Sequence, residues 1–354
     1  MQITHKDEGK ELIMKLGLMA SGFGPQIRID MARIKEAEAL GYDSVWTAEA
    51  WGNDAITPLA WIAAQTSKIK LGTAIMQMPA RTPAMCAMQA LTVDQLSGGR
   101  MIVGLGPSGP QVIEGWHGVA YGKPLKRTRE YIAIMREIFR REKPVEFQGE
   151  YYQMPYKGPG SSGLGKPLRS ILHGRIDIPI YTATISPKGV ETAAEVADGF
   201  IPVWTTPKGL ETFVPHLEAG FRKAGAGKGF GNFEIAVTIN VVVNKDVQAA
   251  RDALKPGIAL YVGGMGARGR NFYTDHVSRQ GWEGDARKIQ DLFLGGKRHE
   301  ATAAVPDALV DELALVGPKE LIRERASAWK ASKATTLLIT GDTNAIEVMA
   351  EAFL

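Results

Sequence analysis

The sequence has a single cysteine, Cys86, among its 354 residues. One cysteine excludes an internal disulfide and any zinc site built from several cysteines. Cys86 falls in an expected helix, and we interpret it as a buried, inert thiol rather than a nucleophile. The six histidines show no metal-ligand spacing, so no metal site is predicted.

Long apolar runs and an excess of charge of one sign are also lacking. No segment is long enough for a membrane-spanning helix, and residues 1–12 have no signal-peptide core, so we expect a cytoplasmic protein with no membrane partner. The net charge of +4 comes from 42 basic and 38 acidic residues that are mixed along the chain. This mixture argues against nucleic acid as the main partner, although a local basic pocket for a phosphate or carboxylate remains possible.

What the sequence does contain is a repeated alternation of apolar strands and helical segments. Strands followed by helices, without hairpin turns between them, predict parallel βαβ units. Eight such strands are expected, centred near residues 16, 45, 73, 103, 181, 203, 239 and 338. Eight units predict a TIM (β/α)8 barrel with insertions after units four and seven. An open doubly wound sheet is the rival, but residues 21–24 (SGFG) lack the third glycine of its phosphate-binding fingerprint.

The predicted boundaries divide the chain into an N-terminal extension, residues 1–13, and one barrel domain, residues 14–354. The third strand is expected to span Ile69–Met78. A small hairpin is expected within Val145–Met154, and a helix over Asp307–Leu315. Polar or special residues follow the second, third and fourth strands, and a barrel binds its ligand at these carboxyl ends.

Five segments together resemble one family: DSVWTAEAW (43–51), KLGTAIMQMPARTP (70–83), QLSGGRMIVGLGPSGPQVIEGWHG (95–118), AEVADGFIPVW (194–204) and LVGPKELIRERASAWKASKATTLLI (315–339). The chain resembles the luciferase-like monooxygenase superfamily, and more narrowly its coenzyme F420-dependent oxidoreductase branch. The resemblance implies a homodimer that transfers a hydride between the deazaflavin F420 and a small organic substrate, such as a carbonyl, an alcohol or an activated alkene.

The resemblance also implies where the cofactor binds. Its ring is expected against Ala74 and Ile75, with a bulge and a non-proline cis peptide between these two residues. The loop of Pro107, Ser108 and Gly109 is expected to bring its backbone close to the cofactor. The acidic tail is expected at Thr184, Ile185 and Ser186, where a helix opened by Pro187 presents free N–H groups. Lys208 and Lys188 could add positive charge there; Arg268 and Arg270 form a second anion-friendly patch or a solvated loop.

The sequence departs from this branch at its catalytic positions. An Asp-His pair is usual after the second strand, and this chain has Glu49 and Ala50. Glu49 is predicted to bind the ring's polar edge or to carry a proton, the alternative being an ion pair at the rim. A glutamate and an asparagine are usual after the fourth strand, where this chain has Gly109 and Val112. His117 is a candidate substitute acid, or an ordinary loop histidine.

Two other functions remain open at this point. The chain could be an FMN-dependent monooxygenase of the same superfamily that takes reduced flavin from a partner. It could also be a non-catalytic flavin-binding barrel, which the missing histidine and acids favour.

Overall fold

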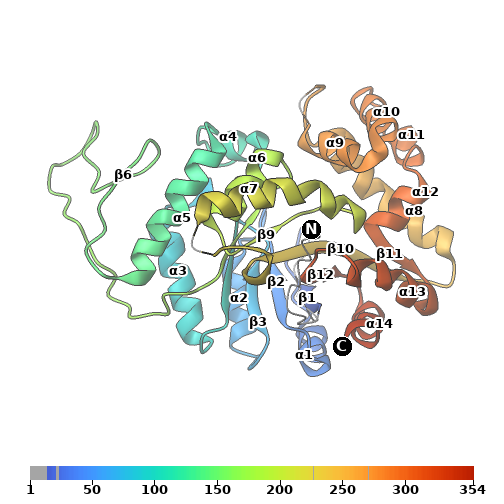
Figure 1. Ribbon diagram of the computed structural model, residues 1–354, viewed down its shortest axis with the longest axis horizontal. Coiled ribbons are helices and arrows are strands. Elements are labelled where there is room, and N and C mark those ends of the chain that lie inside the picture. The colour runs from blue at the N-terminus through green and yellow to red at the C-terminus, as the bar shows by residue number, and fades with distance from the viewer. Residues whose placement is uncertain (1–13, 21–23, 226, 270) are drawn as a thin grey trace, which may run out of the picture.

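The computed structural model describes residues 14–20, 24–225, 227–269 and 271–354, so the predicted extension over residues 1–13 lies outside the described residues. Each strand pairs in parallel with the next around the barrel, and β10 pairs with both β9 and β12, which closes the sheet (Figure 1). The predicted TIM barrel is therefore confirmed. Its strands are β1 (Lys15–Met19), β2 (Ser44–Thr47), β3 (Lys70–Thr73), β5 (Met101–Gly106), β8 (Ile180–Ala183), β9 (Gly199–Ile201), β10 (Glu234–Val243) and β12 (Thr336–Thr340).

Helices surround the barrel, and local signals in the sequence set their ends. The α3 helix starts at Pro83, where the Thr82 hydroxyl accepts a hydrogen bond from the Met85 N–H (3.1 Å). Gly41 ends α1 in a left-handed conformation (φ 94°). The surrounding helices are α1 (Met31–Leu40), α2 (Ile56–Ala63), α3 (Pro83–Leu96), α5 (Pro124–Arg140), α6 (Pro187–Val196), α7 (Val214–Ala224), α8 (Val247–Ala259), α13 (Lys319–Lys330) and α14 (Thr343–Phe353).

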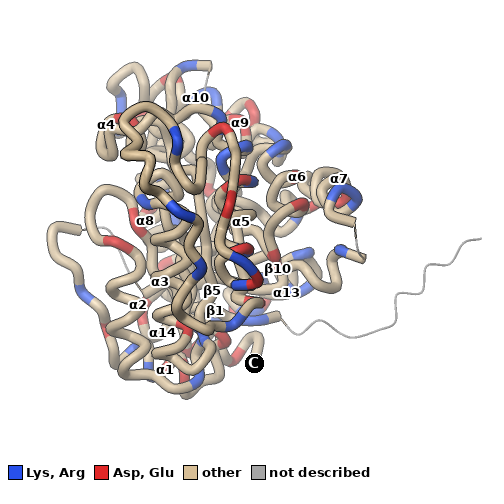
Figure 2. The backbone as a smooth tube through the Cα atoms, turned by 90° about the vertical axis from the view of Figure 1, so that its left-hand side faces the viewer, with Lys and Arg blue, Asp and Glu red and all other residues tan. Residues whose placement is uncertain are grey.

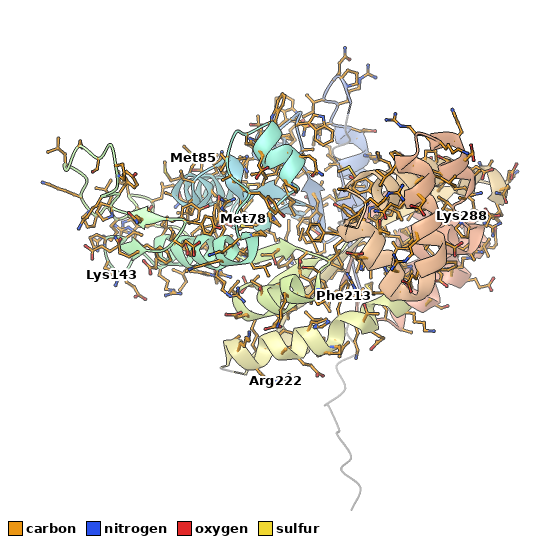
Figure 3. All side chains as sticks on the ribbon, turned by 90° about the horizontal axis from the view of Figure 1, so that it is seen from above. Met78, Met85, Lys143, Phe213, Arg222 and Lys288 are labelled. Carbon is orange, nitrogen blue, oxygen red and sulfur yellow. The ribbon has the colours of Figure 1, made fainter. Side chains whose placement is uncertain are left out.

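Two insertions project from opposite sides of the barrel, and both were predicted. The first follows α5 and holds the antiparallel pair β6 (Phe147–Gln148) and β7 (Gln153–Met154) within a long loop. The second follows α8 and is helical, with α9 (Phe272–Val277), α10 (Glu283–Leu294), α11 (Arg298–Ala303) and α12 (Asp307–Leu313). Lys143 and Lys288 mark the two insertions at opposite ends of the molecule (Figure 3).

Three predicted elements differ from the structure. The strand expected near residue 203 is the shorter β9, which ends at Ile201. The expected strand Ile69–Met78 is divided into β3 and β4 (Met76–Gln77), because the chain turns at Ala74 and Ile75 before β4 pairs with β5. The expected helix Asp307–Leu315 ends at Leu313, and Ala314–Gly317 forms β11 instead. This strand pairs with the second half of β10, which is ten residues long and offers a free edge there.

Side chains fill the interior of the barrel. Trp46 lies at its centre, stacks on Tyr181 with ring centroids 5.9 Å apart, and donates from Nε1 to Ser44 Oγ (2.8 Å). Gly72 is required beside it, because a Cβ there would collide with the Trp46 ring. The interior cluster consists of Trp46, Ile102, Tyr181, Ile201, Ala236 and Leu338. A ligand must therefore bind at one end of the barrel, since no channel passes through a packed core.

The surface carries mixed charge. Basic and acidic residues are interspersed along the backbone (Figure 2), in line with the near balance of the two kinds in the sequence. In the part of the chain that the structure describes, no helix combines the length and apolar character needed to span a bilayer.

Candidate functional site

An apolar floor lies above the packed interior at the carboxyl end of the strands. Met19, Ala74, Ile75 and Ala183 pack onto the interior cluster while remaining partly exposed. The predicted cis peptide joins Ala74 to Ile75. Gly106 on β5 leaves room for the Ile75 side chain, because a Cβ at Gly106 would lie 2.6 Å from Ile75 Cδ1. These four side chains therefore form a fixed, solvent-facing apolar surface at the rim.

Short helices from two parts of the chain stand at this end of the barrel. The α4 helix (Pro110–Gly115) follows β5 directly, and α9 comes from the second insertion. Both lie at the same end of the molecule in two perpendicular views (Figures 1 and 2). The rim is thus bordered by elements that the sequence separates by more than 150 residues.

A polar chain of side chains borders the floor. His117 Nε2 lies 2.7 Å from Gln77 Oε1, and Gln77 Nε2 donates to Ser108 Oγ (3.3 Å). The Tyr121 hydroxyl donates to the Ser108 carbonyl (3.2 Å). Ser108 has a positive φ of 56°, which is uncommon for a non-glycine residue and concentrates at functional sites. The structure therefore brings together two of the predicted residues, His117 and Ser108, through Gln77.

Glu49 lies in a buried ion pair with Arg81. The two guanidinium nitrogens Nη1 and Nη2 each lie 2.8 Å from one carboxylate oxygen. The same oxygens accept backbone hydrogen bonds from Gln77 N (2.6 Å) and Ala55 N (3.1 Å). Burial opposes the charge on Arg81, but its hydrogen bonds with Glu49 outweigh this effect and raise the pKa of Arg81. Glu49 thus joins β2, β4 and the start of α2, and both of its oxygens are engaged.

The loop after β8 has the form expected of an anion site. The Ser186 hydroxyl accepts from the Gly189 N–H (3.2 Å) and caps α6. Arg279, from the second insertion, donates from Nη2 to the carbonyl of Ile185 (2.9 Å). Lys188, by contrast, is paired with Glu191 (2.8 Å). The sequence could not indicate Arg279, because 94 residues separate it from this loop.

Of the remaining predicted cations, those that the structure describes make no hydrogen bond or ion pair with this loop. Arg268 is exposed and paired with Asp291 (2.6 Å), which fits the solvated-loop alternative. Arg270 lies outside the described residues. Lys208 is exposed at the start of a 3-10 helix, Lys208–Phe213, that follows β9.

Trp204 follows β9 at the rim. It also has a positive φ, 54°, and its ring lies 5.2 Å from that of Tyr261 in the second insertion. Its indole Nε1 is buried without a hydrogen-bond partner among the described residues. A buried N–H without an acceptor is rare, and the Trp204 side chain packs against the apolar core of the second insertion.

The family model described as luciferase-like monooxygenase matches residues 14–336. The chain belongs to this family. A Mycobacterium tuberculosis protein, named provisionally as a coenzyme F420-dependent oxidoreductase, is 45% identical over 329 residues, or 92% of this chain and 95% of that one. A 5,10-methylenetetrahydromethanopterin reductase of Methanopyrus kandleri is 31% identical over 322 residues, or 86% of each chain.

Solved structures of luciferase-like proteins share the fold. The coenzyme F420-dependent tetrahydromethanopterin reductase of Methanopyrus kandleri has a TM-score of 0.74 at 24% identity, covering 96% of this chain and 98% of that one. An F420-dependent secondary alcohol dehydrogenase, solved with an F420–acetone adduct, has a TM-score of 0.73 at 21% identity, with the same coverage. At these identities the likeness concerns the fold alone.

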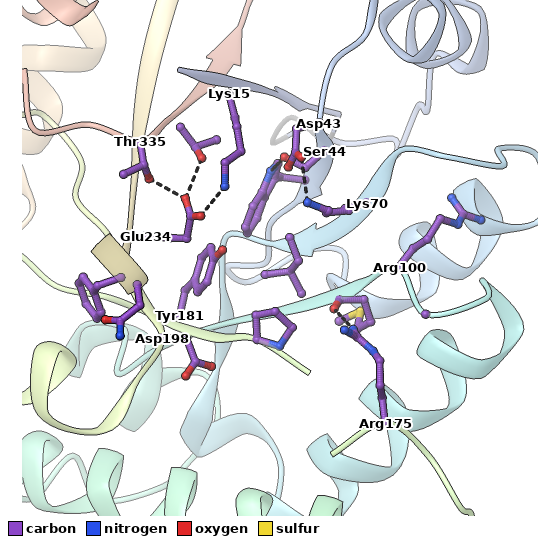
Figure 4. A pocket seen from close by; sticks show the side chains of 18 of the residues that line it. Lys15, Asp43, Ser44, Lys70, Arg100, Arg175, Tyr181, Asp198, Glu234 and Thr335 are labelled. Carbon is purple, nitrogen blue, oxygen red and sulfur yellow. Dashed lines mark hydrogen bonds and ion pairs between the residues drawn. The ribbon is translucent and has the colours of Figure 1, made fainter. Parts of the chain in front are cut away.

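This luciferase-like barrel has a cavity of about 330 Å³ at its other end, where the strands begin (Figure 4). Lys15 and Lys70 reach into it but are paired with Glu234 and Asp43, and Glu234 also accepts from the Thr335 hydroxyl. The amino-terminal face of a TIM barrel serves stability and not chemistry. We therefore place the functional site of this family member at the opposite end.

Proposed function

We propose that the protein is a coenzyme F420-dependent oxidoreductase that transfers a hydride between the deazaflavin and a small organic substrate. The observation that carries the proposal is the apolar floor at the rim, which includes Ala74 and Ile75, the two residues against which the resemblance to the F420 branch expects the ring. The 45% identity to a relative provisionally named for F420 supports the same choice. When bound, F420 supplies the carbon that accepts or donates the hydride.

The residues at the rim fit such a group. A flat, mostly apolar ring needs an apolar support with a few polar groups around it. Ala74, Ile75, Met19 and Ala183 supply the support, and Gln77 and Ser108 supply polar groups at its border. The backbone of Pro107, Ser108 and Gly109 borders the floor on the β5 side, next to Gln77.

We assign proton transfer at the rim to His117, with Gln77 as its positioning residue. With Gln77 Oε1 accepting from His117 Nε2–H, the other ring nitrogen, Nδ1, is left free to take up a proton. Replacement of His117 by Gln should lower turnover at least tenfold, while F420 affinity stays within about twofold. A histidine that only packs in its loop would leave turnover unchanged.

For Glu49 we propose a positioning role in place of the predicted proton transfer. The Glu49 carboxylate holds Arg81 and the backbone of Gln77, so it fixes the segment that carries the ring support and the histidine partner. The contact between Glu49 and Arg81 is of the kind given as the alternative in the sequence analysis, an ion pair at the rim.

The acidic tail of F420 would bind at Thr184, Ile185 and Ser186, beside Arg279. The α6 N-terminus offers N–H groups and a positive dipole end, and Lys208 adds charge after β9. Arg279→Gln should weaken F420 binding about tenfold but leave binding of the tail-less deazaflavin unchanged. Arg287→Gln, an exposed arginine paired with Glu283 on α10, is the matched control and should change neither.

We also propose a homodimer, supported by exposed apolar side chains on two neighbouring helices. Trp61 on α2 is 62% exposed, and Met85 and Met88 on α3 are 46% and 54% exposed. Sedimentation velocity of wild type against Trp61→Glu tests this: the variant should be a monomer. The cytoplasmic location stays a prediction.

One binding experiment separates the candidate functions. Purified apoprotein is titrated with F420 and, separately, with FMN. We expect tight binding of F420 and weak binding of FMN; the reverse order would reject the proposal in favour of an FMN-dependent monooxygenase. F420 binding without turnover on a panel of ketones, secondary alcohols and unsaturated carbonyls would favour the carrier function.

A further inference from the structure

A cavity of about 300 Å³ lies outside the barrel, between the loop after β4 and the first insertion. One wall is the segment from Pro79 to Thr82. The other wall is formed by Val119, Arg127, Tyr151 and Tyr152. None of these residues belongs to the apolar floor or to the loop that caps α6, so this cavity is separate from the proposed F420 site. Its volume suits a small organic molecule.

The cavity faces a buried arginine that uses little of its hydrogen-bonding capacity. Arg127 is only 6% exposed, yet its guanidinium makes one hydrogen bond among the described residues, from Nη2 to the carbonyl of Ala120 (2.8 Å). Its guanidinium carbon also lies 4.6 Å from the centre of the Tyr151 ring. A guanidinium carries five N–H donors, and a buried cation is costly unless these are satisfied.

Arg100 is a buried arginine that also borders a cavity, the one where the strands begin. It is 8% exposed, close to the value for Arg127. Its guanidinium makes five hydrogen bonds, to the Thr66 hydroxyl and to the carbonyls of Ser97, Ile69, Ala63 and Thr66. Arg127 differs because its guanidinium makes a single hydrogen bond among the described residues, although it also lines a cavity.

The other polar groups around the cavity favour a negative occupant. The eight lining residues include two arginines and no carboxylate. Arg81 is balanced by Glu49, while Arg127 has no ion-pair partner among the described residues. Glu130, beside it on α5, is committed to the backbone N–H groups of Glu150, Tyr151 and Tyr152.

Tyr152 adds a hydrogen-bond donor. Its ring packs edge-on against Tyr131 with centroids 5.8 Å apart, and no described residue accepts a hydrogen bond from its hydroxyl. Burial raises the pKa of Tyr152 to about 12, so the hydroxyl keeps its proton at neutral pH.

We propose that this cavity binds a small organic anion, whose carboxylate or phosphate group is held by the guanidinium of Arg127 and the hydroxyl of Tyr152. Guanidinium suits both groups because it can offer two parallel N–H donors to a pair of oxygens. The occupant would touch the Pro79–Thr82 segment, whose Arg81 holds Glu49. This site does not depend on the choice of F420 as cofactor.

Calorimetric titration of the full chain with inorganic phosphate and with succinate, at constant ionic strength in sodium chloride, tests the proposal. We expect the wild type to bind at least one of the two anions at a single site. The dissociation constant should rise about tenfold or more in Arg127→Gln and about two- to tenfold in Tyr152→Phe. Lys126→Gln is the matched control, since Lys126 neighbours Arg127 on α5 but is exposed and paired with Glu150; it should change binding less than about twofold.

The outcomes decide the question in either direction. Binding of succinate alone assigns the site to carboxylates, and binding of phosphate alone assigns it to phosphate esters. No binding of either anion to the wild type overturns the proposal, as does equal weakening by the Arg127 and Lys126 substitutions. Should Arg127→Gln fail to fold, Tyr152→Phe decides alone, because it removes one oxygen and keeps the ring packing: unchanged binding refutes the site.

Discussion

Replacement of Glu49 by Gln distinguishes a positioning carboxylate from a catalytic one. The Glu49 side chain is 5% exposed and that of Arg81 13%, so the pair is screened little by solvent. Gln keeps the shape but has one oxygen in place of two, and its NH₂ group would face N–H donors. Arg81 would lose its counter-charge and two charge-assisted hydrogen bonds.

The structure gives the size of the expected effect. Removing one partner of a buried ion pair costs about 3–5 kcal/mol, and the slight exposure of Arg81 places this pair at the lower end. We therefore expect Glu49→Gln to lower the free energy of unfolding by about 3 kcal/mol. Arg81→Gln should cost a similar amount, and the double variant less than the sum of the two, because the interaction can be lost only once.

Urea denaturation followed by circular dichroism at 222 nm measures these losses, with the slope of the transition checked for constancy across variants. The matched control is Glu283→Gln, which breaks a Glu–Arg pair that is 63% and 69% exposed and should change stability by less than about 0.5 kcal/mol. If Glu49→Gln is as stable as wild type and loses turnover a hundredfold with F420 affinity intact, the positioning role is refuted and the carboxylate carries a proton.

Two further predictions concern other parts of the barrel. Gly106→Ala should displace the Ile75 side chain, which would lower the free energy of unfolding by about 1–3 kcal/mol and weaken F420 binding in a titration. Gly115→Ala is the control: a Cβ there meets open space, so neither stability nor F420 binding should change. His276 has its pKa lowered to about 3 by burial and by Arg279, so the folded state binds fewer protons than the unfolded state below the ordinary value of 6.5. The free energy of unfolding should therefore fall on acidification from pH 7 to pH 5, with about 2 kcal/mol of the loss due to His276. Urea titrations at the two pH values measure this loss, and it should be smaller in His276→Gln. An equal loss in the variant and the wild type would contradict the prediction.

Local signals in the sequence were sufficient for the barrel and for the position of its rim. The strand centres predicted near residues 16, 45, 73, 103, 181, 239 and 338 all lie within observed strands. The β11 strand was missed because the Leu-Ala-Leu-Val run at 313–316 is compatible with both helix and strand. Only the free edge of β10, a feature of the folded sheet, decides between them.

The site was less accessible to prediction, because its contacts join residues far apart in the chain. Glu49 was chosen for its place after β2, and that place is correct. Its role depends on Arg81, which lies 32 residues later and was read only as part of a family motif. Gln77 lies in the same quoted segment, residues 70–83, but its link to His117 spans 40 residues. A sequence shows which residues stand at the rim and leaves open which of them face one another.

The Glu49–Arg81 pair explains how this chain differs from the F420-dependent branch that it resembles. An Asp-His pair after β2 would place a titratable imidazole at position 50, and here that position is alanine. The carboxylate one residue earlier is retained, but a permanently charged guanidinium binds it from the segment after β4. A guanidinium cannot release its proton near neutral pH, so the pair is suited to hold the backbone in place and unsuited to exchange protons. Under the proposed function, an acid–base step would then need a group from another loop, and our proposal assigns it to His117, which contacts Gln77 on the same β4 segment that Glu49 fixes.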